Sequence, residues 1–437
     1  MGYALRGRKV MIAYKMKSLP HLLSLLRVQM LLCTIIGIAV PAFLYSITEE
    51  TVRLSSMATK NTLSASVLAT AVSLISIRKF GEFPGSIGAS YILPAFAASY
   101  SVAVSIIFFA RVPYSGKLLT LTFACSLILR FAISALESRR EGGHFYIVPG
   151  GEVDRIRRDL QVPSFLLEGP ALPTDPGAVI VADLHHSHSS EWERAFAAAA
   201  LRGIAVYHYK QVWEAQTGKV RIEHLSENSL GSLIPSSGYA KAKRFIDICL
   251  IVLATPVILP LFILTAVFII IDSGAPVFFR QERIGYRGRS FRVLKFRTMK
   301  TPGPTDGEKD RVHDAITKDD DDRITRIGHF LRKTRIDELP QIFNILRGEM
   351  SWIGPRPEAQ PLSEWYEKEI PFYSYRHIVR PGITGWAQVN QGHVATVKEV
   401  HDKLRFDFYY IKNFSMWLDL VILFKTVLVV LRGSGAK

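Results

Sequence analysis

The chain has 437 residues, which is enough for two or three domains, and 49% of them are hydrophobic. Its formal net charge of +16 favours partners that carry phosphate, such as anionic lipids or nucleotide substrates. The three cysteines occur singly, which argues against a disulfide framework and a cysteine metal site. No RNA-recognition or zinc-finger motif occurs, so we expect no nucleic-acid partner. The apolar residues are unevenly distributed, which predicts a membrane protein with soluble parts.

Four apolar segments near the N-terminus are candidate membrane spans, at 28–47, 62–77, 90–110 and 117–136. The second is shorter than the others and rich in serine, threonine and alanine. Cations precede the first segment and follow the last: Arg6, Arg8, Lys9, Lys15, Lys17, Arg27, Arg139 and Arg140. The positive-inside rule therefore places both ends in the cytoplasm, which requires an even number of crossings. Residues 1–140 are predicted to form a four-helix transmembrane bundle.

Residues 141–235 are predicted to form a Rossmann-like α/β domain with a parallel sheet. "HFYIV", "GAVIVAD" and "IAVYHY" have the composition of strands, and "SEWERAFAAAALRG" has the pattern of an amphipathic helix that ends at Gly203. The loop "PGGEVDRI" is not a G-x-G-x-x-G motif, so a structural or regulatory domain is favoured over dinucleotide binding. His185, His186 and His188 are metal-ligand types, but their serine-rich setting favours a solvated loop.

Residues 236–437 begin with a long apolar segment, 245–272, that has cations on both flanks. A spanning helix would place one of these cation clusters outside the cell, against the positive-inside rule. Pro256 lies within the segment and bends a helix. We therefore expect a re-entrant helix that breaks at Thr255–Pro256 and returns to the same face. The alternative is an ordinary kinked fifth span.

A basic region with a β-hairpin pattern follows, at 276–299, and it carries Lys295 and Arg297. The acidic run "KDDDDRI" at 318–324 is interpreted as a solvated segment before a helix that starts near Arg323, rather than as a D-x-D metal motif.

"RKTRIDELPQIF", residues 332–343, places Asp337 and Glu338 at the predicted start of a helix that ends at Gly348. Asp337 can cap this helix, and the helix dipole there would keep it ionised. The same position suits a nucleophile that attacks phosphorus, with Glu338 as a Mg²⁺ ligand or proton-handling group. Arg356, between two prolines, and Arg380 are rigidly mounted, as diphosphate binding requires.

Seven motifs occur in order from 243 to 411: "KRFID", Thr255–Pro256, "LKFRTM", "RKTRIDELPQ", "GPRPE", "RPGITGWAQVN" and "KLRFDFYYI". Together they resemble the bacterial sugar transferases, the monotopic polyprenyl-phosphate hexose-1-phosphate transferases that initiate surface polysaccharides. The layout upstream resembles the long members of that family. Short members often carry Ser–Pro at the re-entrant break, where this chain has Thr–Pro.

The resemblance implies a fold and a reaction. It implies a bacterial inner-membrane protein with an α+β catalytic domain on the cytoplasmic face. Asp337 would attack the β-phosphorus of a UDP-hexose, release UMP and pass the sugar phosphate to undecaprenyl phosphate, with Mg²⁺ at Glu338. The phosphate-binding cations expected on these grounds or from the sequence are Lys295, Arg297, Arg332, Arg356 and Arg380, with Asp407 as a further site carboxylate.

Several alternatives stay open at this stage. A membrane regulator that senses a nucleotide without catalysis is the main rival, although it leaves the two adjacent carboxylates unexplained. Glucose-1-phosphate or galactose-1-phosphate is the expected group, and a homodimer is possible. The C-terminal segment 414–431 is expected to lie in the membrane interface, because Asp419 and Lys425 interrupt its apolar run.

Overall fold

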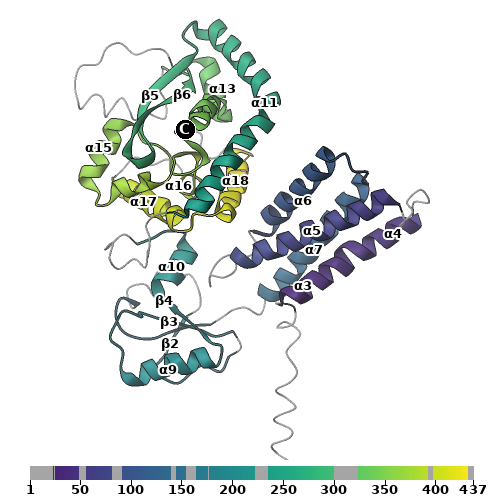
Figure 1. Ribbon diagram of the computed structural model, residues 1–437. Coiled ribbons are helices and arrows are strands. Elements are labelled where there is room, and N and C mark those ends of the chain that lie inside the picture. Colours follow the sequence, from purple (N-terminus) through teal and green to yellow (C-terminus); the bar gives the residue numbers. More distant parts are fainter. Residues whose placement is uncertain are drawn as a thin grey trace, which may run out of the picture. The chain divides into compact units, whose positions relative to one another are not determined.

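The structure is a computed structural model, and Figure 1 shows it as a ribbon coloured along the chain. It divides into two compact units, Met1–Thr217 and Gly218–Lys437, which are described separately. The residues described are 23, 25–48, 56–80, 91–138, 144–153, 164–175, 177–221, 235–299, 323–391 and 397–431. The predicted acidic run before Arg323, and most of the cations used to orient the N-terminal spans, lie outside these residues.

Apolar helices occupy the positions of all four predicted spans. The first is continuous through α3 (Leu26–Leu32), the π-helix η1 (Cys33–Ala39) and α4 (Val40–Thr48), and the others are α5 (Met57–Phe80), α6 (Ile92–Phe109) and α7 (Gly116–Ser138). Each is long and apolar enough to cross a membrane, including the doubtful second one, for which 23 residues qualify.

The serine and threonine residues of α5 explain why its sequence is less apolar than a typical span. Ser66 bonds Thr122 of α7 at 2.8 Å, and Thr70 bonds Tyr100 of α6 at 2.9 Å. All four side chains are buried inside the helical bundle. Hydroxyl groups that bond across helices in this way are typical of packed membrane helices. The polar face of α5 therefore points into the bundle, and this explains why the sequence of this span looks less apolar than those of the other three.

The α/β region contains a four-stranded parallel sheet, as predicted, with strand order β2-β1-β3-β4. Its elements are β1 (Phe145–Ile147), β2 (Ser164–Leu166), β3 (Val179–Ala182), α9 (Ser190–Leu201), β4 (Ala205–His208) and α10 (Tyr209–Thr217). Strand β2 was not predicted, because its three residues are largely exposed and have no alternating pattern. Apolar residues are buried on both faces of the sheet: Trp213 packs on one face, and Ala199 of α9 packs on the other.

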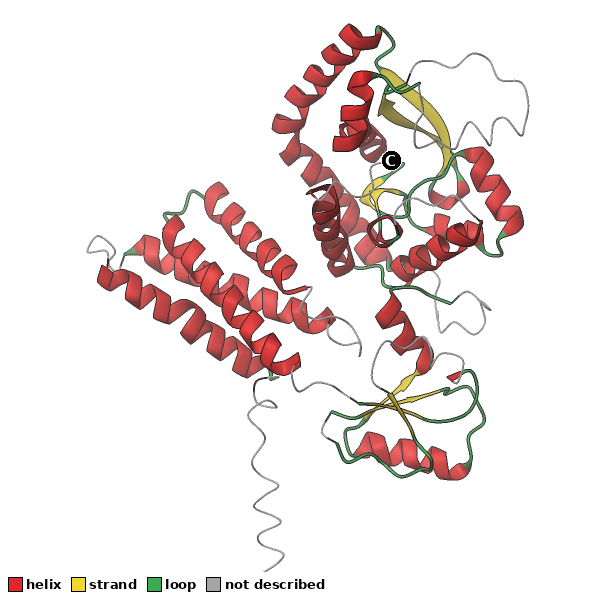
Figure 2. Ribbon diagram, turned by 180° about the vertical axis from the view of Figure 1, so that it is seen from behind, coloured by secondary structure: helices red, strands yellow, loops and turns green. Residues whose placement is uncertain are grey.

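The C-terminal unit begins with α11 (Ser237–Ser273), a helix of 37 residues that contains Pro256 and Pro260. Figures 1 and 2 both show that this helix is bent. Pro256 removes one backbone donor, and the Thr255 hydroxyl donates to the Ile251 carbonyl at 2.7 Å, which also favours bending. The middle of the helix is largely exposed and apolar, with Val257 73% exposed.

Both halves of α11 are tied to the same C-terminal unit. In the first half, Arg244 donates to the carbonyl of Leu346 at 2.9 Å, and Ile251 packs with Val293 and Met350. In the second half, Phe262 and Ile269 pack against Phe296 and Leu331. At 1.5 Å per residue a straight helix of this length would reach about 55 Å, well beyond a hydrocarbon core of about 30 Å. The two anchored halves therefore constrain how the helix can enter a membrane.

The hairpin is formed as predicted, by β5 (Phe278–Ile284) and β6 (Ser290–Phe296), with Lys295 opposite Phe279. The remaining elements are η3 (Tyr286–Gly288), α13 (Arg326–Thr334), η4 (Ile336–Gln341), α14 (Ile342–Arg347), β7 (Ser351–Ile353), α15 (Gln360–Glu369), η5 (Tyr373–Ile378), β8 (Gly382–Thr384), α16 (Trp386–Asn390), α17 (Val397–Lys412) and α18 (Met416–Leu431). Helix α14 stops at Gly348, whose φ of +81° suits glycine, so that prediction is confirmed.

The argument from Asp419 that the C-terminal helix lies in the membrane interface is wrong. Asp419 is buried in α18 and forms an ion pair with Lys243 of α11, and it also accepts a hydrogen bond from Tyr410 at 2.9 Å. Its charge is therefore compensated inside the protein and gives no reason to place the helix at a membrane interface. An acidic residue in an apolar run cannot be assigned to the surface from sequence alone, because its partner comes from a distant element.

Candidate active site

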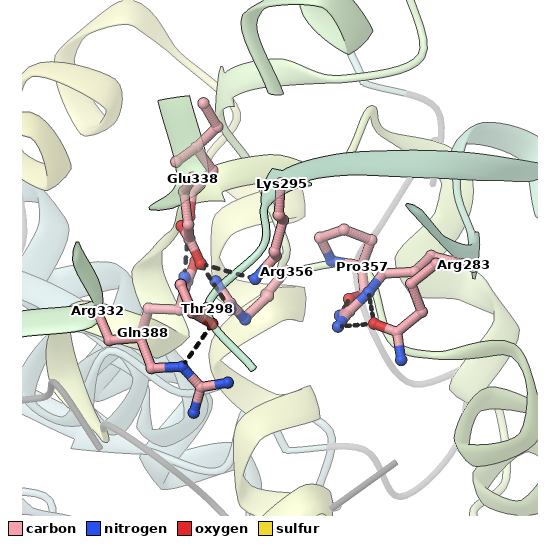
Figure 3. A network of polar contacts seen from close by, with 10 residues as sticks. Arg283, Lys295, Thr298, Arg332, Glu338, Arg356, Pro357 and Gln388 are labelled. Carbon is pink, nitrogen blue, oxygen red and sulfur yellow. Dashed lines mark hydrogen bonds and ion pairs between the residues drawn. The ribbon is translucent and has the colours of Figure 1, made fainter. Parts of the chain in front are cut away.

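One carboxylate oxygen of Glu338 binds two cations that come from different elements. Lys295 of β6 donates to Oε1 at 3.2 Å, and Arg356, in the loop after β7, donates to the same oxygen at 2.9 Å. Figure 3 shows both cations pointing toward Glu338. The Glu338 side chain is only 7% exposed, whereas Lys295 and Arg356 are 18% and 26% exposed. The cations therefore lie between the buried carboxylate and the more accessible side of the site.

Three local features of the sequence bring these groups together. The alternation of the hairpin places Lys295 on β6, which packs against the short helix η4. Arg335 adopts a left-handed conformation, with a φ of +60°, and this lets the chain turn sharply from α13 into η4. Pro355 and Pro357 restrict the backbone on either side of Arg356.

Arg332 is held beside the site by Thr298. Its Nε donates to the Thr298 hydroxyl at 3.0 Å (Figure 3). Helix α13, which carries Arg332, is capped by Thr325, and the Thr325 backbone N–H donates to the Thr298 carbonyl at 3.0 Å. Gly328 lets the helix approach this closely, because a Cβ there would overlap that carbonyl group. Thr325 and Gly328 thus fix the position of α13 and of Arg332, which this helix carries.

Asp337 does not cap a helix, and the prediction that it does is wrong. It lies in the first turn of η4, a 3₁₀-helix whose preceding residue is Arg335, and no side chain caps that turn. Asp337 is 9% exposed, and among the described residues its Oδ1 has no hydrogen-bond partner. A buried acceptor without a partner costs free energy, so it calls for a functional explanation.

The electrostatics of the two carboxylates differ. Burial raises the pKa of Asp337; Lys295, Arg356 and Arg332 offset this only in part, and the charge of Glu338 adds to it. Burial would also raise the pKa of Glu338, but Arg356 and Lys295 outweigh it and hold that pKa well below the usual range. Glu338 therefore stays ionised, whereas Asp337 is a desolvated carboxylate with a weaker preference for the charged form.

Asp407 lies one layer behind Arg356. It is buried and forms an ion pair with Arg376 at 2.8 Å. Arg376 in turn donates to the main-chain carbonyl of Arg356 at 2.9 Å and to the Tyr373 hydroxyl at 2.6 Å. Glu358 completes this layer, since it lies 3.8 Å from Arg376 and forms an ion pair with Lys403. The predicted carboxylate at 407 thus supports the backbone that carries Arg356.

The other two predicted cations contact different parts of the unit. Arg297 donates to the carbonyl of Ser273 at 2.7 Å and to that of Ala275 at 2.9 Å, so it binds the end of α11. Arg380 donates from Nε to the carbonyl of Gly348 at 2.9 Å, and its guanidinium lies 5.0 Å from the Tyr286 ring. Their assignment as phosphate-binding residues stays a prediction.

Three charged residues near the site were not predicted from the sequence. Arg283 donates to the carbonyl of Pro357 (Figure 3), and its Nη2 donates to Gln281 at 2.7 Å. Burial, and after it the neighbouring charge of Arg356, lowers the pKa of Arg283 to about 10. Arg376 and Glu358 are the others. A signal existed for Glu358, which belongs to the quoted "GPRPE" motif, but Arg283 and Arg376 stand in sequences with many cations and no pattern to distinguish them.

The residues present fit Mg²⁺ in part. Mg²⁺ is commonly held by one or two carboxylates together with the phosphates of a substrate. Oδ1 of Asp337, which has no partner in the described part of the chain, offers such a ligand, whereas Glu338 already commits Oε1 to two cations. The donor set therefore suits a metal that arrives with a diphosphate better than one held by protein ligands alone.

Comparison with known proteins identifies the family. Residues 238–433 match the family described as bacterial sugar transferase. The chain is 42% identical over 378 residues to a UDP-N-acetylgalactosamine-undecaprenyl-phosphate N-acetylgalactosaminephosphotransferase of Aeromonas hydrophila, covering 86% of this chain and 88% of the relative. The chain belongs to the bacterial sugar transferase family.

Further members of the bacterial sugar transferase family match a smaller part of the chain. A UDP-glucose:undecaprenyl-phosphate glucose-1-phosphate transferase of Xanthomonas campestris pv. campestris is 42% identical over 231 residues, which is 51% of this chain and 44% of the relative. The protein of the same name from Escherichia coli is 42% identical over 196 residues, or 44% of this chain and 41% of the relative. The predicted resemblance to this family is confirmed.

Proposed function

We propose that this enzyme transfers a sugar 1-phosphate from a UDP-sugar to undecaprenyl phosphate and releases UMP. The observation that carries the proposal is the pairing of Asp337, which is buried and whose Oδ1 has no partner among the described residues, with Glu338, whose charge anchors Lys295 and Arg356. The names of the family members cited above support the two substrates.

The first half-reaction breaks the diphosphate bond. An oxygen of Asp337 attacks the β-phosphorus of the UDP-sugar, and the bridging oxygen leaves with its electron pair on UMP. Lys295, Arg356 and Arg332 face the phosphates and offset the charge that develops on them. Glu338 holds Lys295 and Arg356 in place, because its Oε1 accepts a hydrogen bond from each of them.

The second half-reaction regenerates the enzyme. A phosphate oxygen of undecaprenyl phosphate attacks the phosphorus of the aspartyl-phosphosugar, the bond to Asp337 breaks, and the sugar is left on a lipid-linked diphosphate. Asp337 suits both steps. Its carboxylate is poorly solvated, which makes it a stronger nucleophile in the first step. In the second step the neighbouring cations stabilise the charge of the carboxylate as its bond to phosphorus breaks. Mg²⁺ that arrives with the substrate diphosphate, with a carboxylate of the site as a further ligand, would supply further neutralisation of the phosphate charge.

Helix α11 provides the membrane contact for the lipid substrate. We propose that it is re-entrant, because both of its halves are anchored to the same unit while its middle exposes apolar side chains. A single straight crossing would carry one half away from that unit. The catalytic groups would then lie at the cytoplasmic surface of the inner membrane, where both a soluble nucleotide sugar and a lipid phosphate can reach them.

The donor sugar is the open part of the reaction, and we propose UDP-N-acetylgalactosamine as the first candidate. The support is the 42% identity over most of both chains to the Aeromonas hydrophila family member named for it. The test is UMP release by purified protein with undecaprenyl phosphate and each of four donors, UDP-N-acetylgalactosamine, UDP-N-acetylglucosamine, UDP-glucose and UDP-galactose. Release from another donor alone would replace the proposed sugar, and release from none of the four would contradict the proposed reaction with these donors.

A further inference from the structure

The carboxyl edge of the α/β sheet gathers a carboxylate and two imidazoles that the transfer reaction does not use. Asp183 directly follows β3, and His208 ends β4 opposite Ala182. His185 lies two residues beyond Asp183. In the strand order β2-β1-β3-β4 the chain changes direction across the sheet between β1 and β3. Ligands of open parallel sheets bind outside the carboxyl ends of the strands at such a point, which Asp183 borders, whereas His208 lies one strand further along.

The potential ligand atoms of these three residues are close together. His185 Nδ1 lies 2.7 Å from His208 Nε2, and His208 Nε2 lies 3.8 Å from Asp183 Oδ1. The ligand atoms of the three side chains all lie within 4.8 Å of one another. Two ligands bound to one tetrahedral zinc ion at about 2.0 Å are separated by roughly 3.3 Å, which falls between the two observed separations.

The carboxylate is already oriented by the backbone. Asp183 Oδ2 accepts from the N–H of Glu152 at 3.1 Å, and Oδ1 accepts from the N–H of His185 at 3.1 Å. Gly151, in the loop after β1, has a φ of +66°, and a Cβ there would lie 2.9 Å from the carboxylate carbon of Asp183. The loop is thus shaped around Asp183, as expected for a fixed ligand supported by a second layer of contacts.

The site is open on one side. Asp183 and His208 are buried, whereas His185 is exposed. An exposed ring can move by a few tenths of an ångström to widen the short separation between the two imidazoles. His188 does not join the ligand set, since its Nε2 lies 2.9 Å from the main-chain carbonyl of Asp183 and holds the loop instead.

We propose that Asp183, His185 and His208 bind a divalent transition-metal ion of the zinc class, with a fourth position open to solvent. Two imidazoles and one carboxylate form a set that suits Zn²⁺ or Co²⁺, whereas Mg²⁺ prefers oxygen ligands alone. The bound ion would connect the end of β3, the following loop and the end of β4, and so stabilise the α/β region. This site uses none of the residues of the catalytic site, where Mg²⁺ is expected at Glu338.

The contacts that His208 makes behind the proposed site also limit the affinity for the metal ion. A metal-bound histidine usually donates its other ring N–H to an acceptor, but His208 Nδ1 instead faces the N–H of Lys210 at 3.2 Å. Metal binding at Nε2 must displace the proton that the His185 and His208 rings share. It also disturbs the contact between His208 Nδ1 and the Lys210 N–H. We therefore expect binding that is weaker than at a structural zinc site and reversible by chelators.

The test uses the full-length protein in detergent, freed of affinity tags and stripped of metal with EDTA. Equilibrium dialysis against Zn²⁺ followed by elemental analysis should find about one bound ion per chain, and Co²⁺ should give the absorption bands of a tetrahedral site. Zn²⁺ should raise the thermal unfolding temperature, and Mg²⁺ should not reproduce that shift.

The matched variants are His185→Gln and His186→Ala, which alter two exposed histidines of the same loop. His185→Gln should lose the ion, the Co²⁺ bands and the Zn²⁺-dependent shift, while His186→Ala should keep all three. His208→Gln, compared with wild type in EDTA to verify folding, should behave like His185→Gln. Absence of retained metal in the wild type, or equal retention by His185→Gln, would overturn the site.

Discussion

Arg376 donates a hydrogen bond at 2.9 Å to the main-chain carbonyl of Arg356, and so connects a buried layer of charges to a cation of the site. The same guanidinium forms an ion pair with Asp407, and the two side chains are 2% and 1% exposed. Position 356 is therefore set by contacts to its backbone as well as by its own ion pair with Glu338.

The first prediction concerns Arg376→Gln. The change leaves Asp407 buried without its cation, and breaking a buried ion pair costs about 3–5 kcal/mol. For a unit of this size that corresponds to a fall of about 6–20 °C in the unfolding temperature, measured in detergent. Arg292→Gln is the control, because Arg292 and its partner Glu282 are 68% and 54% exposed. Equal, small shifts for both variants would contradict the buried layer.

The second prediction concerns the pH dependence of turnover. In the proposed mechanism Asp337 must be ionised to attack, so the rate should fall as the pH drops through its pKa. Burial raises that pKa and Arg332 lowers it, so Arg332→Gln should move the acid limb of the rate profile to higher pH. Arg332→Lys keeps the charge and should move it less. An unchanged acid limb in Arg332→Gln would show that Arg332 does not influence the pKa of Asp337.

The third prediction is that Arg356→Lys is severely impaired although the charge is kept. Arginine can bind Glu338 through one nitrogen and present its remaining donors to a phosphate, which a lysine ammonium cannot reproduce in the same geometry. A loss of about 3 kcal/mol of transition-state stabilisation lowers turnover by roughly a hundredfold. Turnover is measured as UMP release at saturating substrates. Near wild-type activity would exclude this role for the guanidinium.

The fourth prediction concerns the topology of α11. Lys241 and Arg289 flank its apolar region and are exposed, so single cysteines can replace them in a chain whose three native cysteines are removed. Both cysteines should resist a membrane-impermeant thiol reagent in spheroplasts and react after lysis, because both flanks are cationic. Tyr114→Cys, between α6 and α7, should react in both conditions. Reaction of only one flank in spheroplasts would support a fifth crossing.

The sequence predicted those parts of the fold that have local signals. The four apolar segments, the hairpin, the parallel sheet and the stop at Gly348 all follow from hydropathy, alternation or glycine chemistry. The missed strand β2 has only three residues and no such pattern. The role of Asp419 was misjudged because its partner Lys243 comes from a helix 176 residues away in sequence.

The site could be predicted only in part for the same reason. Glu338, Lys295 and Arg356 stand in motifs that resemble the family, and the structure brings them together. The buried layer of Arg376 and Glu358 could not be found, because burial of a charge depends on partners that come from several elements. The unpartnered Oδ1 of Asp337 was also unpredictable, since the residue types at 337 and 338 equally suit a helix cap.

The central claim is that Asp337 forms a covalent bond to the sugar phosphate. A nucleophile divides the reaction into two halves, so UDP-sugar alone should release UMP in about one equivalent per active site. The sugar phosphate should remain on the protein as an acyl phosphate that hydroxylamine removes. Asp337→Asn should show neither event, whereas Glu338→Gln should form the same adduct more slowly.

The most direct measurement is therefore the intact mass of the purified protein after incubation with UDP-sugar in the absence of undecaprenyl phosphate. The account predicts a mass increase of one sugar phosphate that maps to Asp337 and disappears when undecaprenyl phosphate is added. An unmodified wild-type protein that releases UMP only when undecaprenyl phosphate is present would contradict it, because Asp337 would then act as a base or a metal ligand in a single-step transfer.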